Sequence, residues 1–128
     1  MIELVAAETD TEAAARIRKV VWRWLYVEAE TIEYYRATWP MFRDWLALLD
    51  GEPVGIGACA PILGEEETAA AFALNSVLPE ARGRGVGTAI YRHVSEHARS
   101  LGKAELQTFG FEDDLGGVAF AEHHGFTV

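Results

Sequence analysis

Residues 82–88 read Arg-Gly-Arg-Gly-Val-Gly-Thr and place three glycines at alternate positions between two apolar segments. The segment before them, Ala69 to Val77, is typical of a buried strand. The segment after them repeats apolar residues at three- and four-residue steps, as an amphipathic helix does. The chain must therefore turn sharply from a strand into a helix. The bare N–H groups of such a helix start favour an anion, because a helix N-terminus carries partial positive charge.

The composition of this turn suits a phosphate ligand. Gly83, Gly85 and Gly87 have no Cβ, so a ligand can approach their backbone closely. The guanidiniums of Arg82 and Arg84 add positive charge. An unliganded glycine cap is the competing structural interpretation.

Two common nucleotide motifs do not fit the turn. A P-loop has a lysine after its last glycine, but Thr88 follows Gly87. The dinucleotide fingerprint Gly-x-Gly-x-x-Gly would start at Gly83 and need a glycine at position 88. Both nucleotide readings are therefore excluded.

The turn does match Arg-x-x-Gly-x-Gly, and a Val-x-Pro step at 77–79 precedes it. Residues 120–126, which end in Gly-Phe, follow in the expected order. With these motifs the chain, over about residues 72–127, resembles the GNAT superfamily of acetyl-CoA-dependent N-acetyltransferases. The resemblance implies that the turn holds the pyrophosphate of coenzyme A and that the preceding strand binds the pantetheine arm. The cofactor-binding residues that it implies are Val77, Arg82, Gly83, Arg84, Gly85, Val86, Gly87 and Thr88.

Length, charge and cysteine content indicate the number of domains, the class of partner and the location of the protein. The 128 residues predict a single domain over 1–128, and the net charge of −9 argues against nucleic acid as a partner. No apolar run approaches the ~20 residues of a membrane span, so we expect no membrane partner. Cys59 is the only cysteine, which favours a cytoplasmic protein. It lies in the apolar run from Val54 to Ile62, so we expect a buried thiol.

Periodicity and turn residues predict the order β-αα-β-β-β-α-β-α, which is that of an α/β domain. It is also the order of a GNAT domain, whose mixed, mostly antiparallel sheet is flanked by helices. The predicted strands are Ile2 to Ala7, Asp44 to Leu49, Pro53 to Ile62, Thr68 to Leu78 and Ala104 to Phe109. The predicted helices are Glu12 to Ala29 with Thr9 or Asp10 as N-cap, Thr31 to Thr38, Val86 to Leu101 and Leu115 to His124.

The predicted sheet has a short or missing last strand. GNAT chains usually continue for a strand or more after the Gly-Phe pair, whereas this sequence stops at Val128. Either the domain is minimal, or the sequence is truncated or is one half of a longer two-domain protein. A missing strand leaves an exposed sheet edge, which invites pairing with another chain. We therefore predict a homodimer that buries this edge.

Acetyl transfer needs a base for the amine, a donor for the oxyanion and an acid for the leaving thiolate. The resemblance implies that Val77 offers backbone groups to pantetheine and to the oxyanion. In the GNAT family, a tyrosine that protonates the leaving thiolate often stands four residues before the glycine of Gly-Phe. This chain has Ala121 at that position. His123 and His124 are alternative acids, and an exposed polar helix end is the competing interpretation.

No catalytic residue follows from the sequence. The strand from Ala69 to Val77 holds no acid, and Gln107 stands in the next strand where a glutamate would suit a base. Proton relay through water by Glu28, Glu30 or Glu33 competes with a role as surface charge.

The segment His93 to His97 reads His-Val-Ser-Glu-His, a zinc-peptidase signature on a helix. Helical steps of 100° place His97 inside the apolar face and His93 at its border. We therefore expect a histidine pair at the edge of the core and no metal site.

Aromatic residues concentrate in the first two predicted helices, in the region that lines the acceptor pocket of GNAT domains. The resemblance implies that some of these rings receive the acceptor, and aromatic faces also suit a cationic amine. The residues are Trp22, Trp24, Tyr26, Tyr34, Tyr35 and Trp39.

The resemblance, together with the lack of a convincing nucleophile, predicts an acetyl-CoA-dependent N-acetyltransferase. It would transfer the acetyl group to a primary amine of a small molecule or polypeptide by direct attack. The alternative is a non-catalytic acyl-CoA-binding module or the regulatory half of a larger protein. Both readings require coenzyme A binding, and thiol release with a panel of amines separates them.

Overall fold

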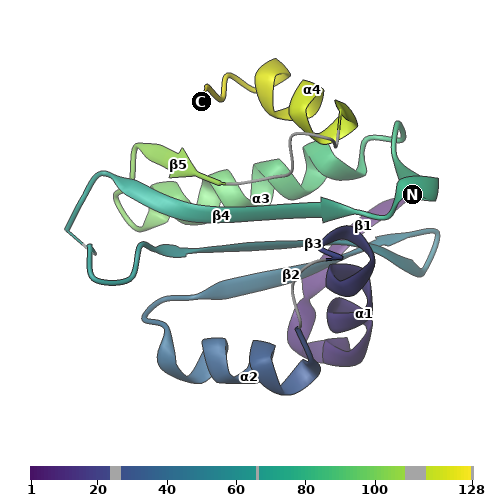
Figure 1. The fold of residues 1–128 in the computed structure, drawn as a ribbon, viewed down its shortest axis with the longest axis horizontal. Helices are drawn as coiled ribbons and strands as arrows, with labels where there is room; N and C mark the ends of the chain where they lie inside the picture. The colour runs from purple at the N-terminus through teal and green to yellow at the C-terminus, as the bar shows by residue number, and fades with distance from the viewer. Residues whose placement is uncertain (24–26, 66, 109–114, 128) are drawn as a thin grey trace.

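The computed structural model describes residues 1–23, 27–65, 67–108 and 115–127, and its elements follow the predicted order (Figure 1). The strands are β1 (Ile2–Ala6), β2 (Arg43–Leu49), β3 (Glu52–Pro61), β4 (Ala70–Val77) and β5 (Glu105–Gln107). The helices are α1 (Thr11–Val21), α2 (Ala29–Thr38), α3 (Val86–Ser100) and α4 (Leu115–His123), with 3-10 turns η1 (Ala7–Asp10) and η2 (Pro79–Ala81).

The strands form one mixed sheet in the order β1-β2-β3-β4-β5, antiparallel except for the parallel pair β4 and β5. Helices α1 and α2 cover one face, and α3 covers the other (Figure 1). The mixed, mostly antiparallel sheet flanked by helices is thereby confirmed. In the described part of the chain no strand follows α4, so the sheet ends at β5.

The hairpin between β2 and β3 follows directly from its sequence. Asp50 and Gly51 both have positive φ, +51° and +85°, as the two-residue turn that matches strand twist requires. The N-terminal ammonium of Met1 lies 2.6 Å from the Asp50 carboxylate and lowers the pKa of that acid. The Asp50-Gly51 turn is confirmed.

The prediction that the first helix runs to Ala29 is wrong. Helix α1 begins after Asp10, whose carboxylate accepts from the Ala13 N–H at 3.1 Å, and ends at Val21. Trp22 leaves the helix, and its indole donates to the buried Ser76 hydroxyl of β4 at 2.7 Å. This tertiary contact overrides the local helix preference.

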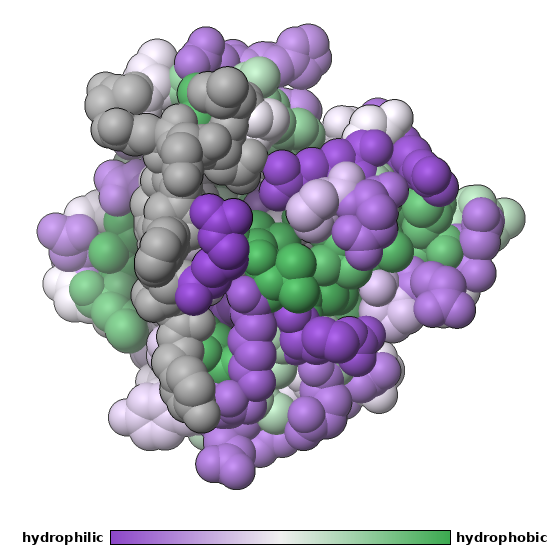
Figure 2. Space-filling model, turned by 45° about the vertical axis from the view of Figure 1, so that its right-hand side comes forward, coloured by the Kyte–Doolittle hydropathy of each residue, from purple (hydrophilic) through white to green (hydrophobic). Residues whose placement is uncertain are grey.

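The surface is not uniformly polar. Figure 2 shows hydrophobic side chains gathered at the centre of one face, with hydrophilic side chains around them. No helix in the described ranges is both long and apolar enough to cross a membrane.

Cys59 is fully buried in β3, as predicted, and burial raises the pKa of its thiol to about 11. Because the folded state disfavours the thiolate, this group stabilises the fold below the thiol's unfolded pKa of ~8.5 and loses that contribution as pH rises towards 11. We expect the unfolding free energy to fall more steeply over this range in the wild type than in Cys59→Ala. Denaturant titrations at stepped pH measure this, and equal slopes in the two proteins would contradict it.

Candidate functional site

The edge of β4 that faces β5 presents backbone groups towards the glycine turn. Pairing with β5 is described only from Ala70 to Phe72. The Leu78 N–H donates to the Val54 carbonyl on the β3 side, at 2.8 Å. Because backbone groups alternate between the two sides of a strand, those of Val77 point away from β3. On the side that faces β5, the backbone groups of β4 between Ala73 and Val77 have no strand partner among the described residues.

The glycine turn follows this edge and opens α3. Gly83 and Gly85 have φ of +78° and +87°, a backbone conformation that residues with a Cβ rarely adopt. Gly85 is the N-cap and supplies no side chain to cap the helix. The first-turn N–H groups of Val86, Gly87 and Thr88 therefore have no partner within the helix. The turn thus combines the backbone geometry and the donors that an anion requires.

The two arginines of the turn differ in their contacts. The Arg82 Nε donates to the Val77 carbonyl at 3.1 Å, so this side chain folds back over the end of β4. Arg84 is exposed and lies close enough to Asp50 to contribute to lowering the pKa of that acid, after the larger effect of the N-terminal ammonium. The structure thus gathers the predicted cofactor residues 77 and 82–88 at one end of β4.

Gly87 also has a packing role, in addition to its predicted place in the cofactor site. A Cβ at this position would lie 2.9 Å from the Phe120 ring, because α4 packs across the first turn of α3. His124 secures α4 there, with ring centroids 4.2 Å from Phe120 and 4.6 Å from Tyr91. His124 is therefore half-buried between rings rather than at an exposed helix end, whereas His123 is exposed.

On the opposite face of the sheet, aromatic rings line a cavity of about 300 Å³ where the described pairing of β4 with β5 ends. Trp39 stacks on Phe72 at 5.4 Å, and its indole donates to the Pro61 carbonyl. Tyr35 meets Trp39 edge-on at 6.0 Å, and Tyr34 is exposed. The predicted Trp24 and Tyr26 lie outside the described residues.

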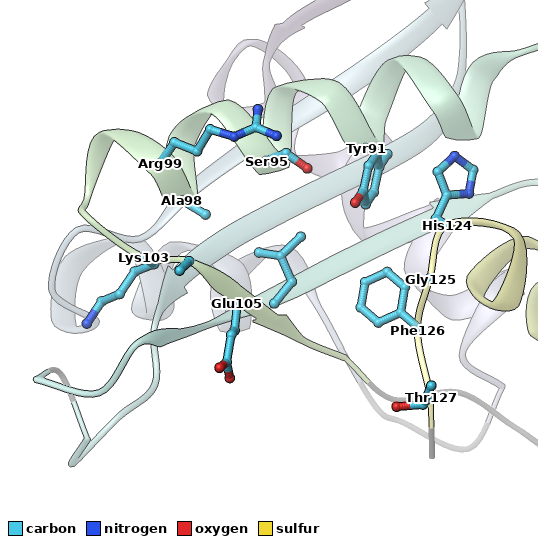
Figure 3. Close-up of a pocket in the computed structure, with 12 residues that line it drawn as sticks. Tyr91, Ser95, Ala98, Arg99, Lys103, Glu105, His124, Gly125, Phe126 and Thr127 are labelled. Carbon is cyan, nitrogen blue, oxygen red and sulfur yellow. The ribbon is translucent and has the colours of Figure 1, made fainter.

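A second cavity, of about 360 Å³, lies along β5 and the second half of α3, away from the glycine turn (Figure 3). Tyr91, His124 and Phe126 lie towards one end of it, and Arg99 and Lys103 towards the other. This hollow follows the predicted sheet edge.

The histidines of α3 lie at the edge of the core, as expected. His93 and His97 both meet the Trp45 ring edge-on, at 6.1 and 5.7 Å. The His97 Nε2 lies 3.0 Å from the Met41 carbonyl. Among the described residues, no cluster of three metal-ligating side chains occurs.

The three glutamates considered as proton relays, Glu28, Glu30 and Glu33, cap a helix or lie on the surface. Glu28 is the N-cap of α2 and lies 2.6 Å from Lys19, while Glu30 and Glu33 are exposed. Gln107 is exposed at the end of β5 and contributes to the aromatic cavity. None of these contacts identifies a catalytic base.

The sequence model of the acetyltransferase (GNAT) family matches residues 12–126. The chain is 32% identical over 84 residues to the uncharacterized N-acetyltransferase YjgM of Escherichia coli strain K12, a match covering 64% of this chain and 49% of the relative. It therefore spans about half the length of this curated relative.

Solved structures share the fold at low sequence identity. The aminoglycoside acetyltransferase AAC(6')-Iy, in complex with a bisubstrate analogue built on coenzyme A, matches with a TM-score of 0.80 and 17% identity, over 100% of this chain and 92% of that one. YncA of Salmonella typhimurium, solved with its cofactor acetyl-CoA, matches with a TM-score of 0.80 and 17% identity, over 99% and 80%.

Proposed function

Because this chain belongs to the acetyltransferase (GNAT) family, we propose that it transfers the acetyl group of acetyl-CoA to a primary amine. The observation that carries the proposal is the junction of two donor sets, the β4 edge up to Val77 and the first turn of α3. The first set suits the amides of a pantetheine arm, and the second suits a pyrophosphate. Solved neighbours hold coenzyme A or acetyl-CoA, which supports the same cofactor here.

We propose direct attack in a ternary complex. The amine nitrogen attacks the thioester carbonyl carbon, the C–N bond forms, and the C–S bond breaks as the coenzyme A thiolate leaves. The amine loses one proton, and the thiolate takes one up. The Val77 N–H is our candidate donor for the oxyanion. Cys59 is fully buried with its pKa raised to about 11, which disfavours a covalent cysteine intermediate.

Replacing Arg82 by alanine tests the cofactor site. We expect acetyl-CoA affinity to fall by roughly 10- to 100-fold, the effect of one charge-assisted hydrogen bond of ~1.5–3 kcal/mol. Arg92→Ala removes the same charge from an exposed position on α3 outside the turn and serves as the matched control. Isothermal titration measures both. Equal affinities in the two variants would contradict the assignment of Arg82.

The alternative, a binding module without catalysis, also requires the glycine turn. Ala121 and the unassigned base favour this alternative. Release of free thiol from acetyl-CoA with a panel of primary amines separates the two, because only the enzyme releases thiol in an amine-dependent way.

We also propose, as a finer point, that the sheet edge at β5 pairs with a second copy in a homodimer. The strand order supports this, since β5 is an edge strand and no described strand pairs with its outer side. Light scattering at high protein concentration measures the mass, and a monomer mass would refute the dimer. The cytoplasmic location likewise stays a prediction.

A further inference from the structure

A buried polar cluster lies between α1, α2 and β2, on the face of the sheet that carries the aromatic cavity. Arg36 holds Asp44 with two hydrogen bonds, Nε to Oδ1 at 3.0 Å and Nη2 to Oδ2 at 2.8 Å. The Arg36 Nη1 donates to the Thr11 hydroxyl at 2.8 Å. Asp44 is 7% exposed, and each of its two carboxylate oxygens accepts one of these hydrogen bonds.

Arg18 belongs to the same cluster without sharing this pairing. Its Nε is buried and has no hydrogen-bond partner in the part of the chain that the structure describes. Burial lowers the pKa of its guanidinium, and nearby Tyr35 and Asp44 oppose that shift. Arginine stays protonated in proteins. With Asp44 neutralised by Arg36, the cluster therefore has one surplus positive charge.

The surplus charge lies on the acceptor side of the proposed reaction. Arg18 stands one helical turn before Trp22, whose indole reaches Ser76 of β4. Tyr35, which interacts with Arg18, also meets the ring of Trp39. Trp39 lines the aromatic cavity beside the end of the β4–β5 pairing.

From this arrangement we propose that Arg18 binds an anionic group of the acceptor, so the acceptor is a primary amine that also carries a carboxylate. The apolar part of the acceptor lies against Trp39 and Phe72, which stack at 5.4 Å. The Arg18 Nε has no hydrogen-bond partner among the described residues, and the surplus positive charge of its cluster attracts a carboxylate and repels a polycation. This inference rests on the proposed function, because it names the acceptor class of the same site.

The test compares amines with and without a carboxylate in protein saturated with coenzyme A. The pairs are phenylalanine with 2-phenylethylamine, and 6-aminohexanoate with hexylamine, so that both short and long spacings are covered. We expect at least one carboxylate-bearing member to bind roughly 10-fold more tightly than its partner, as one charged hydrogen bond predicts. Isothermal titration measures the four affinities.

The variant Arg18→Met is expected to remove this preference while leaving the affinity of the member without a carboxylate unchanged. Arg18→Lys keeps the charge and should restore part of the preference. Arg16→Met, at an exposed position of α1, is the matched control and should bind as the wild type does. Thermal melts of each variant show that it is folded.

Equal affinities within both pairs, the absence of binding by all four amines, or an equal loss for both members in Arg18→Met would each overturn the inference. Titration of acetyl-CoA into the same proteins before coenzyme A is added separates failure of the acceptor inference from failure of the proposed function. If acetyl-CoA binds and the carboxylate preference is absent, the inference about the acceptor fails alone. If acetyl-CoA does not bind, the proposed function fails.

Discussion

Gly85→Ala is expected to weaken acetyl-CoA binding by at least roughly 10-fold, which corresponds to loss of one charge-assisted hydrogen bond. Gly85 caps α3 with a φ of +87°, and its nearest neighbour around an added Cβ is Ile2 Cδ1 at 3.7 Å. The protein itself therefore leaves room for the methyl group. The added methyl group instead occupies the side from which we propose that the pyrophosphate approaches. Isothermal titration measures the affinity.

The backbone strain of this substitution needs a matched control, which Gly102 provides. Gly102 follows α3 with a φ of +75° and has nothing within 4 Å of an added Cβ. An L-residue in this left-handed region costs about 1–2 kcal/mol at either position. Gly85→Ala and Gly102→Ala should therefore lose similar stability, while only Gly85→Ala loses cofactor affinity. The same affinity in both variants would show that the turn does not hold the ligand.

Gly57→Ala is expected to destabilise the fold by about 1–3 kcal/mol or more, the usual cost of overpacking a core. A Cβ at Gly57 of β3 would lie 2.4 Å from Ile90 Cγ2 and 3.3 Å from Val94 Cγ2. The glycine thus lets α3 approach the sheet, and α3 starts at the proposed cofactor turn. Urea unfolding measures the loss relative to wild type.

A double-mutant cycle with Ile90→Ala isolates this contact. Truncating Ile90 costs stability alone, but it also removes the atom that the new methyl group would strike. The double variant should therefore be more stable than the sum of the single effects predicts, by roughly 1 kcal/mol. Strict additivity would mean that the two side chains do not collide.

The features that depend on residues close together in the sequence were predictable. The glycine turn, the Asp50-Gly51 hairpin and the apolar face of α3 each depend on neighbouring residues, and the structure has all of them. The end of α1 was not predictable, because the Trp22 indole binds Ser76, which is 54 residues away. Local periodicity contains no information about such a partner.

Much of the candidate site depends on packing between distant elements. The pairing of Arg36 with Asp44, and the burial of Arg18 beside it, bring together α1, α2 and β2. Each residue alone reads as ordinary surface charge. Likewise, Phe120 against Gly87 arises only when α4 folds across α3. A signal for the latter was available, since a glycine inside a helix often has a packing reason.

We propose that the end of β4 and the glycine turn bind acetyl-CoA. The most direct test is an isothermal titration of acetyl-CoA into the wild-type protein, repeated with Gly85→Ala and Gly102→Ala. We expect saturable binding of one cofactor per chain, retained in Gly102→Ala and weakened at least roughly 10-fold in Gly85→Ala. No binding to the wild type at saturating acetyl-CoA would contradict it.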